Sequence, residues 1–165
     1  MKELKVCNVF IECNENELSI GDAELVNRAR EAAKNAYAPY SGFYVGAATL
    51  LDNGMIITGS NQENAAYPSG LCAERVALFT AVSNFRSNAI TTIAVAAYNG
   101  LEFTAKPISP CGACRQVLLE YEKRQQTPIR IILYGKEAVY TASSALSLMP
   151  LCFDSSYLKN DADEL

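Results

Sequence analysis

Three cysteines stand in two short motifs that could bind a metal ion or carry out thiol chemistry. Cys72 opens the motif CAER, and Cys111 and Cys114 are spaced i, i+3 behind Pro110. Each motif begins a predicted helix, and helix N-termini favour thiolates through their free N–H groups. Three thiolates are a known zinc set. Because the fourth position stays open for water, the pattern is that of a catalytic zinc site rather than a structural one.

Other interpretations of the cysteines stay open at this stage. A C-x-x-C pair at the start of a helix is also typical of thiol oxidoreductases, which would need neither Cys72 nor zinc. A zinc-stabilised binding module without turnover is a second alternative. Cys152 could fold back and close the zinc site, although the open site is favoured. Cys7 and Cys13 stand alone and are expected to be incidental thiols.

Glu74 lies two residues after Cys72 and is the candidate proton carrier. In a regular helix these two side chains would point in nearly opposite directions. Both can face one pocket only if Cys72 occupies the N-cap with non-helical dihedrals. Glu74 could then accept a proton from a zinc-bound water and deliver it to a leaving group. The alternative is a first-turn glutamate that only stabilises the helix dipole.

Two arginines follow the motifs and could adjust the charge of such a site. Zinc with three thiolates has a net formal charge of minus one, which weakens its effect on a bound water. Arg75 or Arg115 could offset this charge by donating a hydrogen bond to a ligand sulfur. The alternative is a surface arginine, and it weighs more for Arg115 than for Arg75.

The amino-acid composition excludes several kinds of catalytic group and partner. The 165 residues include no histidine, which excludes imidazole bases and imidazole metal ligands. The net charge of −4 disfavours a nucleic-acid partner, which would require a basic surface. No apolar run approaches the roughly 18 residues of a membrane span, and charged residues interrupt the N-terminal segment. We therefore expect a cytoplasmic protein with no membrane partner.

The hydrophobic pattern predicts a single domain over residues 1–165, in which helices and strands alternate. The segment 1–20 is expected to be an N-terminal arm, with an edge strand or an ordered extension at 4–13, and the tail from 159 is expected to be frayed. Helices are expected at 22–36, 72–84, 111–124 and 142–149, and strands at 43–51, 55–59, 90–97 and 129–134.

This order predicts an α/β fold in which helices cover the faces of one central sheet. The hairpin at 43–59, with Asn53 and Gly54 in its turn, makes part of the sheet antiparallel. The strand–helix–strand unit over 90–134 should be parallel and right-handed. If the helices at 72–84 and 111–124 lie side by side on one face, their first residues can bring the three sulfurs together.

Four ordered motifs resemble the small, homotetrameric cytidine deaminases that act on free nucleosides. They are PYSGFYVGAA, NQENAAY, CAER and SPCGACRQ, at residues 39–48, 61–67, 72–75 and 109–116. The resemblance covers residues 22–153. It implies a three-layer α/β/α fold with a central mixed sheet of about five strands. It also implies zinc, one ion per chain, and hydrolytic deamination of cytidine and 2′-deoxycytidine, a reaction of pyrimidine salvage. A deaminase for another cytosine-like compound stays open as an alternative.

The resemblance also implies a role for individual residues. The zinc ligands would be Cys72, Cys111 and Cys114, with Glu74 as the proton shuttle, Arg75 as the compensating charge, and Arg115 and Gln116 beside the ligands. Substrate would be held by Asn61 and Glu63 at the ribose, Phe43 and Ala73 at the base, and Tyr67 and Phe153 in a neighbouring subunit's site. Without the resemblance, Asn61 and Glu63 would be polar turn residues and Phe43 a core residue. The segment 68–71 departs from the family pattern.

Overall fold

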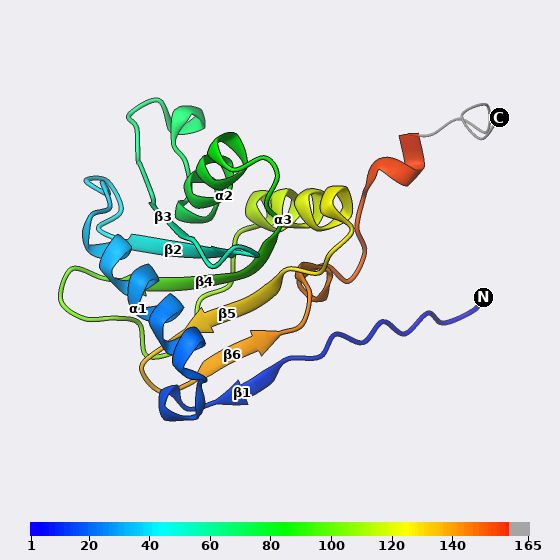
Figure 1. The fold of residues 1–165 in the computed structure, drawn as a ribbon, viewed down its shortest axis with the longest axis horizontal. Helices are drawn as coiled ribbons and strands as arrows, with labels where there is room; N and C mark the ends of the chain where they lie inside the picture. Colours follow the sequence, from blue (N-terminus) through cyan, green and yellow to red (C-terminus); the bar gives the residue numbers. More distant parts are fainter. Residues whose placement is uncertain (159–165) are drawn as a thin grey trace.

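A six-stranded mixed sheet forms the middle layer of the computed structural model, which describes residues 1–158 (Figure 1). The strand order is β1-β6-β5-β4-β2-β3. The predicted frayed tail, residues 159–165, lies outside the described residues. The elements are β1 (Ile11–Cys13), α1 (Ile20–Lys34), β2 (Tyr44–Leu51), β3 (Ile56–Ser60), α2 (Ala73–Asn84), β4 (Ile90–Tyr98), α3 (Gly112–Gln125), β5 (Arg130–Tyr134) and β6 (Val139–Ala142).

Alternating side chains of the central strands feed two separate cores. Ala47 and Val95 pack on the face that α2 and α3 cover, whereas their neighbours Ala48 and Ala94 pack on the face that α1 covers. Successive side chains of a strand point to opposite faces, so strands buried on both sides consist of continuous apolar runs. The predicted three-layer α/β/α arrangement is confirmed.

The strand directions follow the predicted connections. The β2–β3 hairpin is antiparallel, and β4 pairs parallel to β5 through the crossover helix α3. Because α2 and α3 follow β3 and β4 onto the same face, their N-termini lie near each other (Figure 1). This arrangement brings two motifs together that are 39 residues apart in the sequence.

The sheet has six strands, not the expected five or so. The additional strand is β6, which pairs antiparallel with β5 across the short turn at 135–138. The helix expected at 142–149 is instead the 3-10 helix η3 (Ala145–Leu148), which follows β6 directly. Of the extended segment expected at 4–13, only Ile11–Cys13 forms a strand, at the edge beside β6.

Close backbone contacts fix the helices against the sheet. At Gly59 of β3, an added Cβ would lie 2.4 Å from the backbone nitrogen of Ala77 in α2. At Gly46 of β2, it would lie 2.0 Å from the carbonyl oxygen of Ala29 in α1. Only glycine permits this approach, so both helices rest directly on the strand backbone. Within the described residues, no helix combines the length and apolar character needed to cross a bilayer.

The N-terminal segment is joined to the sheet by an aromatic and ionic cluster. Arg30 of α1 pairs with Glu15 at 3.0 Å, and its guanidinium lies over the rings of Phe103 and Tyr134 at 5.0 and 4.9 Å. The Tyr134 hydroxyl also donates to Glu15. These contacts hold the 3-10 helix η1 (Glu15–Glu17), and with it the start of α1, against β5.

Candidate active site

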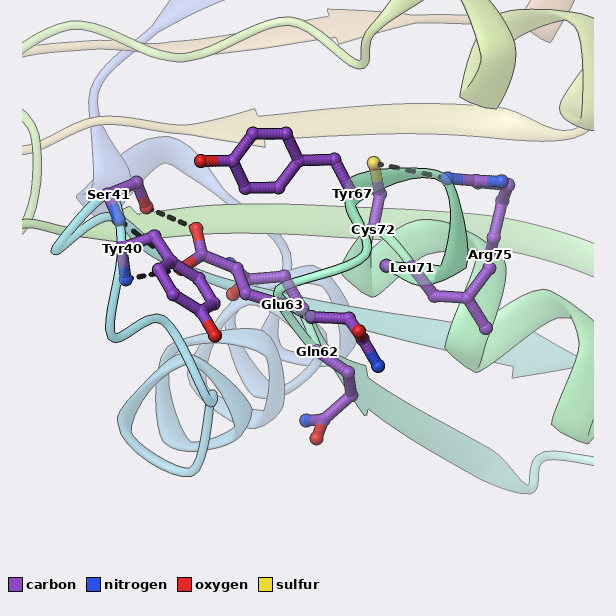
Figure 2. Close-up of a pocket in the computed structure, with 11 residues that line it drawn as sticks. Tyr40, Ser41, Gln62, Glu63, Tyr67, Leu71, Cys72 and Arg75 are labelled. Atoms are coloured by element: carbon purple, nitrogen blue, oxygen red, sulfur yellow. Dashed lines mark hydrogen bonds between the residues drawn. The ribbon is translucent and has the colours of Figure 1, made fainter.

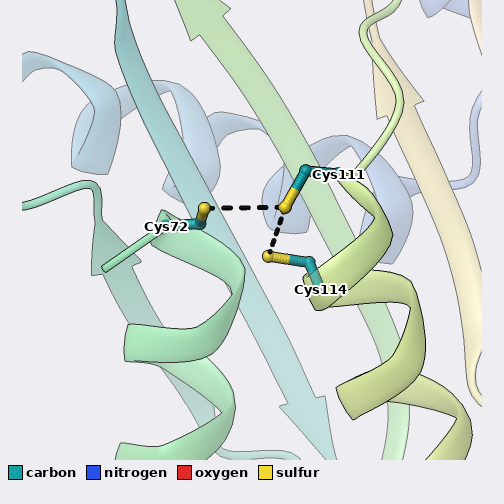
Figure 3. A group of neighbouring side chains, drawn as sticks. All are labelled: Cys72, Cys111 and Cys114. Carbon is teal, nitrogen blue, oxygen red and sulfur yellow. Dashed lines mark hydrogen bonds between the residues drawn. The ribbon is translucent and has the colours of Figure 1, made fainter. Parts of the chain in front are cut away.

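The three motif cysteines converge at the N-termini of α2 and α3 (Figure 3). Cys72 and Cys111 are the N-cap residues of these helices, both with extended backbone, and Cys114 is buried in the first turn of α3. The Cys111 sulfur lies 3.8 Å from that of Cys72 and 3.5 Å from that of Cys114. All three sulfurs lie within 4.8 Å of one another.

This donor set fits zinc. Sulfur atoms around a tetrahedral zinc ion, with bonds of about 2.3 Å, lie about 3.8 Å apart. All three thiols are free, and both helix N-termini favour their ionised form. Within residues 1–158, the group with this spacing contains no fourth ligand. Cys152 does not close it, because it lines a different cavity together with Cys7.

The Cys72 thiol is strongly acidic in this arrangement. Its pKa is lowered to about 5, chiefly by its interaction with the neighbouring Cys114 thiol, while burial opposes the change. The same interaction raises the pKa of Cys114, and burial adds to that effect. Cys72 is therefore a thiolate at neutral pH, ready to bind a metal cation.

Glu74 is buried beside the sulfurs, with 4% of its surface exposed. The extended backbone of Cys72 meets the geometric condition for the two side chains to serve one pocket. Burial is the largest influence on the carboxyl group and raises its pKa, and the charge of Cys72 acts in the same direction. A carboxyl group with a raised pKa can hold and release a proton closer to neutral pH.

Arg75 carries the positive charge nearest to the sulfurs. Its Nη2 atom donates to the Cys72 sulfur at 3.7 Å, as Figure 2 shows. Its Nε atom is buried without a hydrogen-bond partner within the described residues. This guanidinium partly offsets the negative charge of the thiolates, which is the effect that we expect of an arginine at this position.

Arg115 and Gln116 lie next to the three site cysteines but do not bind their sulfurs. Arg115 donates to the carbonyl oxygens of Pro110 and Leu148, at 2.8 and 3.2 Å, and to the hydroxyl of Ser109. It therefore fixes the backbone that precedes Cys111, and the idea that it donates to a sulfur is not supported. Gln116 donates to the carbonyl oxygen of Phe153 at 2.8 Å and so anchors the C-terminal segment.

A cavity of about 510 Å³ opens beside Cys72 and Arg75 (Figure 2). Its walls come from the loop before β2, the segment after β3 and the turn before α2. Of the predicted substrate residues, Asn61, Glu63 and Tyr67 line it. The volume suits a small molecule rather than a macromolecule.

The loop before β2 surrounds the carboxylate of Glu63. The hydroxyl of Ser41 donates to Oε1 at 2.5 Å, and the backbone N–H groups of Tyr40 and Ser41 donate to Oε2 at 2.8 and 3.3 Å. These donors lower the pKa of Glu63, with the Ser41 hydroxyl as the largest cause. Glu63 is therefore an anion that faces the cavity.

Asn61 is bound to the backbone of β2. Its Oδ1 accepts from the N–H of Val45 at 2.7 Å, and its Nδ2 donates to the carbonyl oxygen of Phe43 at 2.9 Å. Each polar atom keeps one further bonding position for a ligand. Phe43 is 38% exposed and is not a core residue in this chain.

The other predicted substrate residues lie in varied places. Ala73 is fully buried as the first residue of α2. Tyr67 is 77% exposed at the cavity wall, with its ring 6.2 Å from that of Tyr40 in an edge-to-face contact. Phe153 is 57% exposed, stacks on Tyr157, and does not line this cavity.

Comparison with known proteins identifies the family of this chain. The family described as "Cytidine and deoxycytidylate deaminase zinc-binding region" matches residues 20–127, which is well over half of the chain and includes all three site cysteines. This chain belongs to that deaminase family. The resemblance to cytidine deaminases and the predicted enzyme class are confirmed.

Individual deaminases show how far the similarity extends. A cytidine deaminase of Halalkalibacterium halodurans is 47% identical over 96 residues, which cover 58% of this chain and 68% of that protein. One of Mycobacterium tuberculosis is 42% identical over 97 residues. The crystal structure of the Burkholderia pseudomallei cytidine deaminase is 39% identical and has a TM-score of 0.69, covering 79% of this chain and 97% of that chain.

Sequence reasoning missed part of this deaminase site. Ser41 and Tyr40 stand in a recognised motif, yet neither was expected to contact Glu63. Leu71 also lines the cavity. Gly42, whose φ of +63° lies in the region that favours glycine, was a usable signal that the loop turns sharply next to Ser41.

Proposed function

We propose that this deaminase hydrolyses free cytidine and 2′-deoxycytidine to uridine or deoxyuridine and ammonia, in pyrimidine salvage. One observation carries the proposal: three free thiols within 4.8 Å of one another share one end of the fold with the buried carboxyl group of Glu74. A structural zinc site would have no use for that carboxyl group. A dithiol oxidoreductase would have no use for the third sulfur.

Cys72, Cys111 and Cys114 would hold one zinc ion per chain. Zinc supplies a water molecule that is activated for attack at neutral pH. Arg75 would keep the Cys72 sulfur ionised and oriented through its hydrogen bond. Arg115 would hold the backbone of Pro110, so that Cys111 enters α3 at a fixed angle.

Glu74 would move the protons of the reaction. Its carboxylate accepts a proton from the water that attacks C4 of the cytosine ring and passes it to N3. It then assists proton transfer to the exocyclic amine, which leaves as ammonia. The burial that raises the pKa of Glu74 supports this role, because a proton carrier works best when its pKa lies near the working pH.

Glu63 and Asn61 would recognise the ribose. Glu63 can accept a hydrogen bond from a hydroxyl group, and its negative charge disfavours a phosphate at the same place. This supports a nucleoside substrate rather than a nucleotide. Phe43 would lie against the pyrimidine ring, and the backbone of Ala73 would contact its polar edge.

Neighbouring subunits would complete each site in a homotetramer. Phe153 and Tyr67 are both more than half exposed in the single chain, as expected for side chains that reach another subunit. The six free cysteines suit the reducing conditions of the cytoplasm.

A substrate panel tests this function. The purified, zinc-analysed protein is incubated with cytidine, 2′-deoxycytidine, deoxycytidylate, free cytosine and single-stranded DNA, and both ammonia and the uracil product are measured. We expect turnover of the two nucleosides with about one zinc per chain. Turnover of deoxycytidylate or DNA alone would contradict the nucleoside assignment. Reduction of a disulfide substrate by Cys111 and Cys114, without deamination, would favour the oxidoreductase.

A further inference from the structure

Ser41 joins the two sides of the candidate substrate site through one hydroxyl group. Its Oγ donates to Oε1 of Glu63 at 2.5 Å and accepts from the backbone N–H of Phe43 at 3.0 Å. In the proposed function, Glu63 would hold the ribose and Phe43 would lie against the base; of these two residues, Glu63 lines the cavity. One oxygen atom therefore bonds both the Glu63 carboxylate and the backbone of Phe43, the two residues that would hold the two halves of a nucleoside.

The hydrogen bonds of Glu63 leave it little freedom. A carboxylate has about four acceptor positions, and the loop before β2 occupies three of them in this structure. About one position remains for a ligand. Glu63 can therefore accept one sugar hydroxyl in one direction, provided that Ser41 and Tyr40 hold it.

Phe43 is held on both sides of its peptide unit. Ser41 accepts from its N–H, and Asn61 donates to its carbonyl oxygen at 2.9 Å. Asn61 also accepts from Val45, the second residue of β2. Loss of the Ser41 hydroxyl would release the N-terminal side of Phe43 while Asn61 still held the other side.

The local backbone places the Ser41 hydroxyl inside this network. Gly42 adopts a φ of +63°, and its N–H donates to the carbonyl oxygen of Ala38 at 3.0 Å, which closes a sharp turn. Figure 2 shows Ser41 and Tyr40 on the same side of the Glu63 carboxylate. The turn thus presents two backbone donors and one hydroxyl to the same group.

We propose that Ser41 is a positioning residue that sets the sugar-hydroxyl specificity of this site, by orienting Glu63 and Phe43 together. This inference rests on the proposed deamination of nucleosides. Ser41 need not contact the reacting atoms, because it acts through the two residues that it binds. Its loss should weaken substrate recognition much more than the chemical step.

The test compares Ser41→Thr with Ser41→Val, which differ by a hydroxyl in place of a methyl group, and adds Ser41→Ala. Each zinc-loaded variant is assayed with cytidine and with two analogues that lack the 2′- or the 3′-hydroxyl. In the wild type, we expect one analogue to have a clearly raised KM. In Ser41→Val and Ser41→Ala, KM for cytidine should rise about tenfold, as for loss of a charge-assisted hydrogen bond, with kcat within about threefold.

The ratio of the analogue KM to the cytidine KM separates positioning from a general structural role. We expect this ratio to fall toward one in Ser41→Val and Ser41→Ala, and to stay near the wild-type value in Ser41→Thr. Ser69→Ala is the matched control, since Ser69 is exposed and does not line the cavity. Its ratio should not change.

Two results would overturn the inference while leaving the function intact. One is an unchanged KM ratio in Ser41→Val and Ser41→Ala, and the other is a wild type that shows no preference between cytidine and either analogue. Absence of deamination by the wild type with zinc bound would instead refute the proposed function, and the inference with it.

Discussion

The guanidinium of Arg75 lies 3.7 Å from the sulfur of Cys72, three residues earlier at the N-cap of the same helix. The cation and the sulfur therefore belong to one helical turn. The Cys114 thiol is the largest cause of the low pKa of Cys72, and Arg75 contributes in the same direction. The site thus neutralises part of its own negative charge before any ligand is bound.

Replacing Arg75 should make Cys72 less acidic. In Arg75→Gln, we expect the pKa of Cys72 to rise from about 5 toward its ordinary value of 9.0. The measurement is the rate of Cys72 alkylation against pH in the metal-free, reduced protein, with the modified residue identified by mass spectrometry. Arg28→Gln, an exposed change on α1, is the control. An identical midpoint in wild type and Arg75→Gln would contradict the role of the guanidinium.

The close contact of β3 with α2 predicts a strong effect at Gly59. In Gly59→Ala, the added methyl group would lie 2.4 Å from the nitrogen of Ala77, which is helix backbone and cannot turn aside. We expect the free energy of unfolding to fall by about 1–3 kcal/mol in urea titrations. Gly21→Ala is the control, because nothing lies within 4 Å of the added Cβ. Equal stability of both variants would contradict the packing argument.

Most elements could be predicted from local patterns, and the exceptions have physical causes. The helices at α2 and α3 begin one residue after the predicted starts, because Cys72 and Cys111 are caps rather than helical residues. The strand β6 has only four residues, too few for a reliable alternation, and its position depends on pairing with β5. The strand β6 therefore forms because of a tertiary contact and not because of its own sequence pattern.

The candidate site likewise contains residues that local motifs predict and contacts that form only between distant parts of the chain. The grouping of three cysteines could be predicted, because each motif lies at the start of a recognisable helix. The partners of Arg115 could not, since Leu148 lies 33 residues away and binds through its backbone. Ser41 and Glu63 are 22 residues apart and meet only after the loop before β2 has folded. No regular sequence spacing predicts the contact between these two residues.

An ion pair between α1 and β5 predicts a pH dependence of stability. Burial acts to raise the pKa of Asp22, but the hydrogen-bonded ion pair with Arg130 and the nearby Ser19 hydroxyl outweigh it, and the net pKa is lowered. A carboxyl group with a lowered pKa stabilises the fold above its unfolded pKa of about 3.9, and this is lost as pH falls through the folded value. Asp22→Asn should therefore be less stable than wild type by about 1 kcal/mol at pH 7.

That difference should shrink as the pH is lowered below about 4, where the wild-type carboxyl group also becomes neutral. Urea unfolding at several pH values measures it, at constant zinc. Glu24→Gln, on the exposed face of α1, should show no such trend. A difference between Asp22→Asn and wild type that stays constant from pH 7 to pH 3 would refute the ion-pair interpretation.

Complementation between subunits tests whether Phe153 acts in a neighbouring site. Phe153→Ala and Glu74→Gln chains, each nearly inactive alone, should recover activity when they are co-expressed as mixed tetramers. Sites with Glu74 from one chain and Phe153 from another would then form. Light scattering checks for a mass of about four chains of 17.9 kDa. If mixing restores no activity although mixed oligomers form, Phe153 does not serve a neighbouring site.

The central claim is that Glu74 moves protons at a zinc site that three thiolates hold. The most direct measurement is ammonia release from cytidine by wild type and by Glu74→Gln, with zinc determined in the same samples. We predict about one zinc per chain in both, turnover by the wild type, and a rate about 10²–10⁴-fold lower in the variant. Near-normal turnover by zinc-loaded Glu74→Gln, or no ammonia from the zinc-loaded wild type, would contradict the claim.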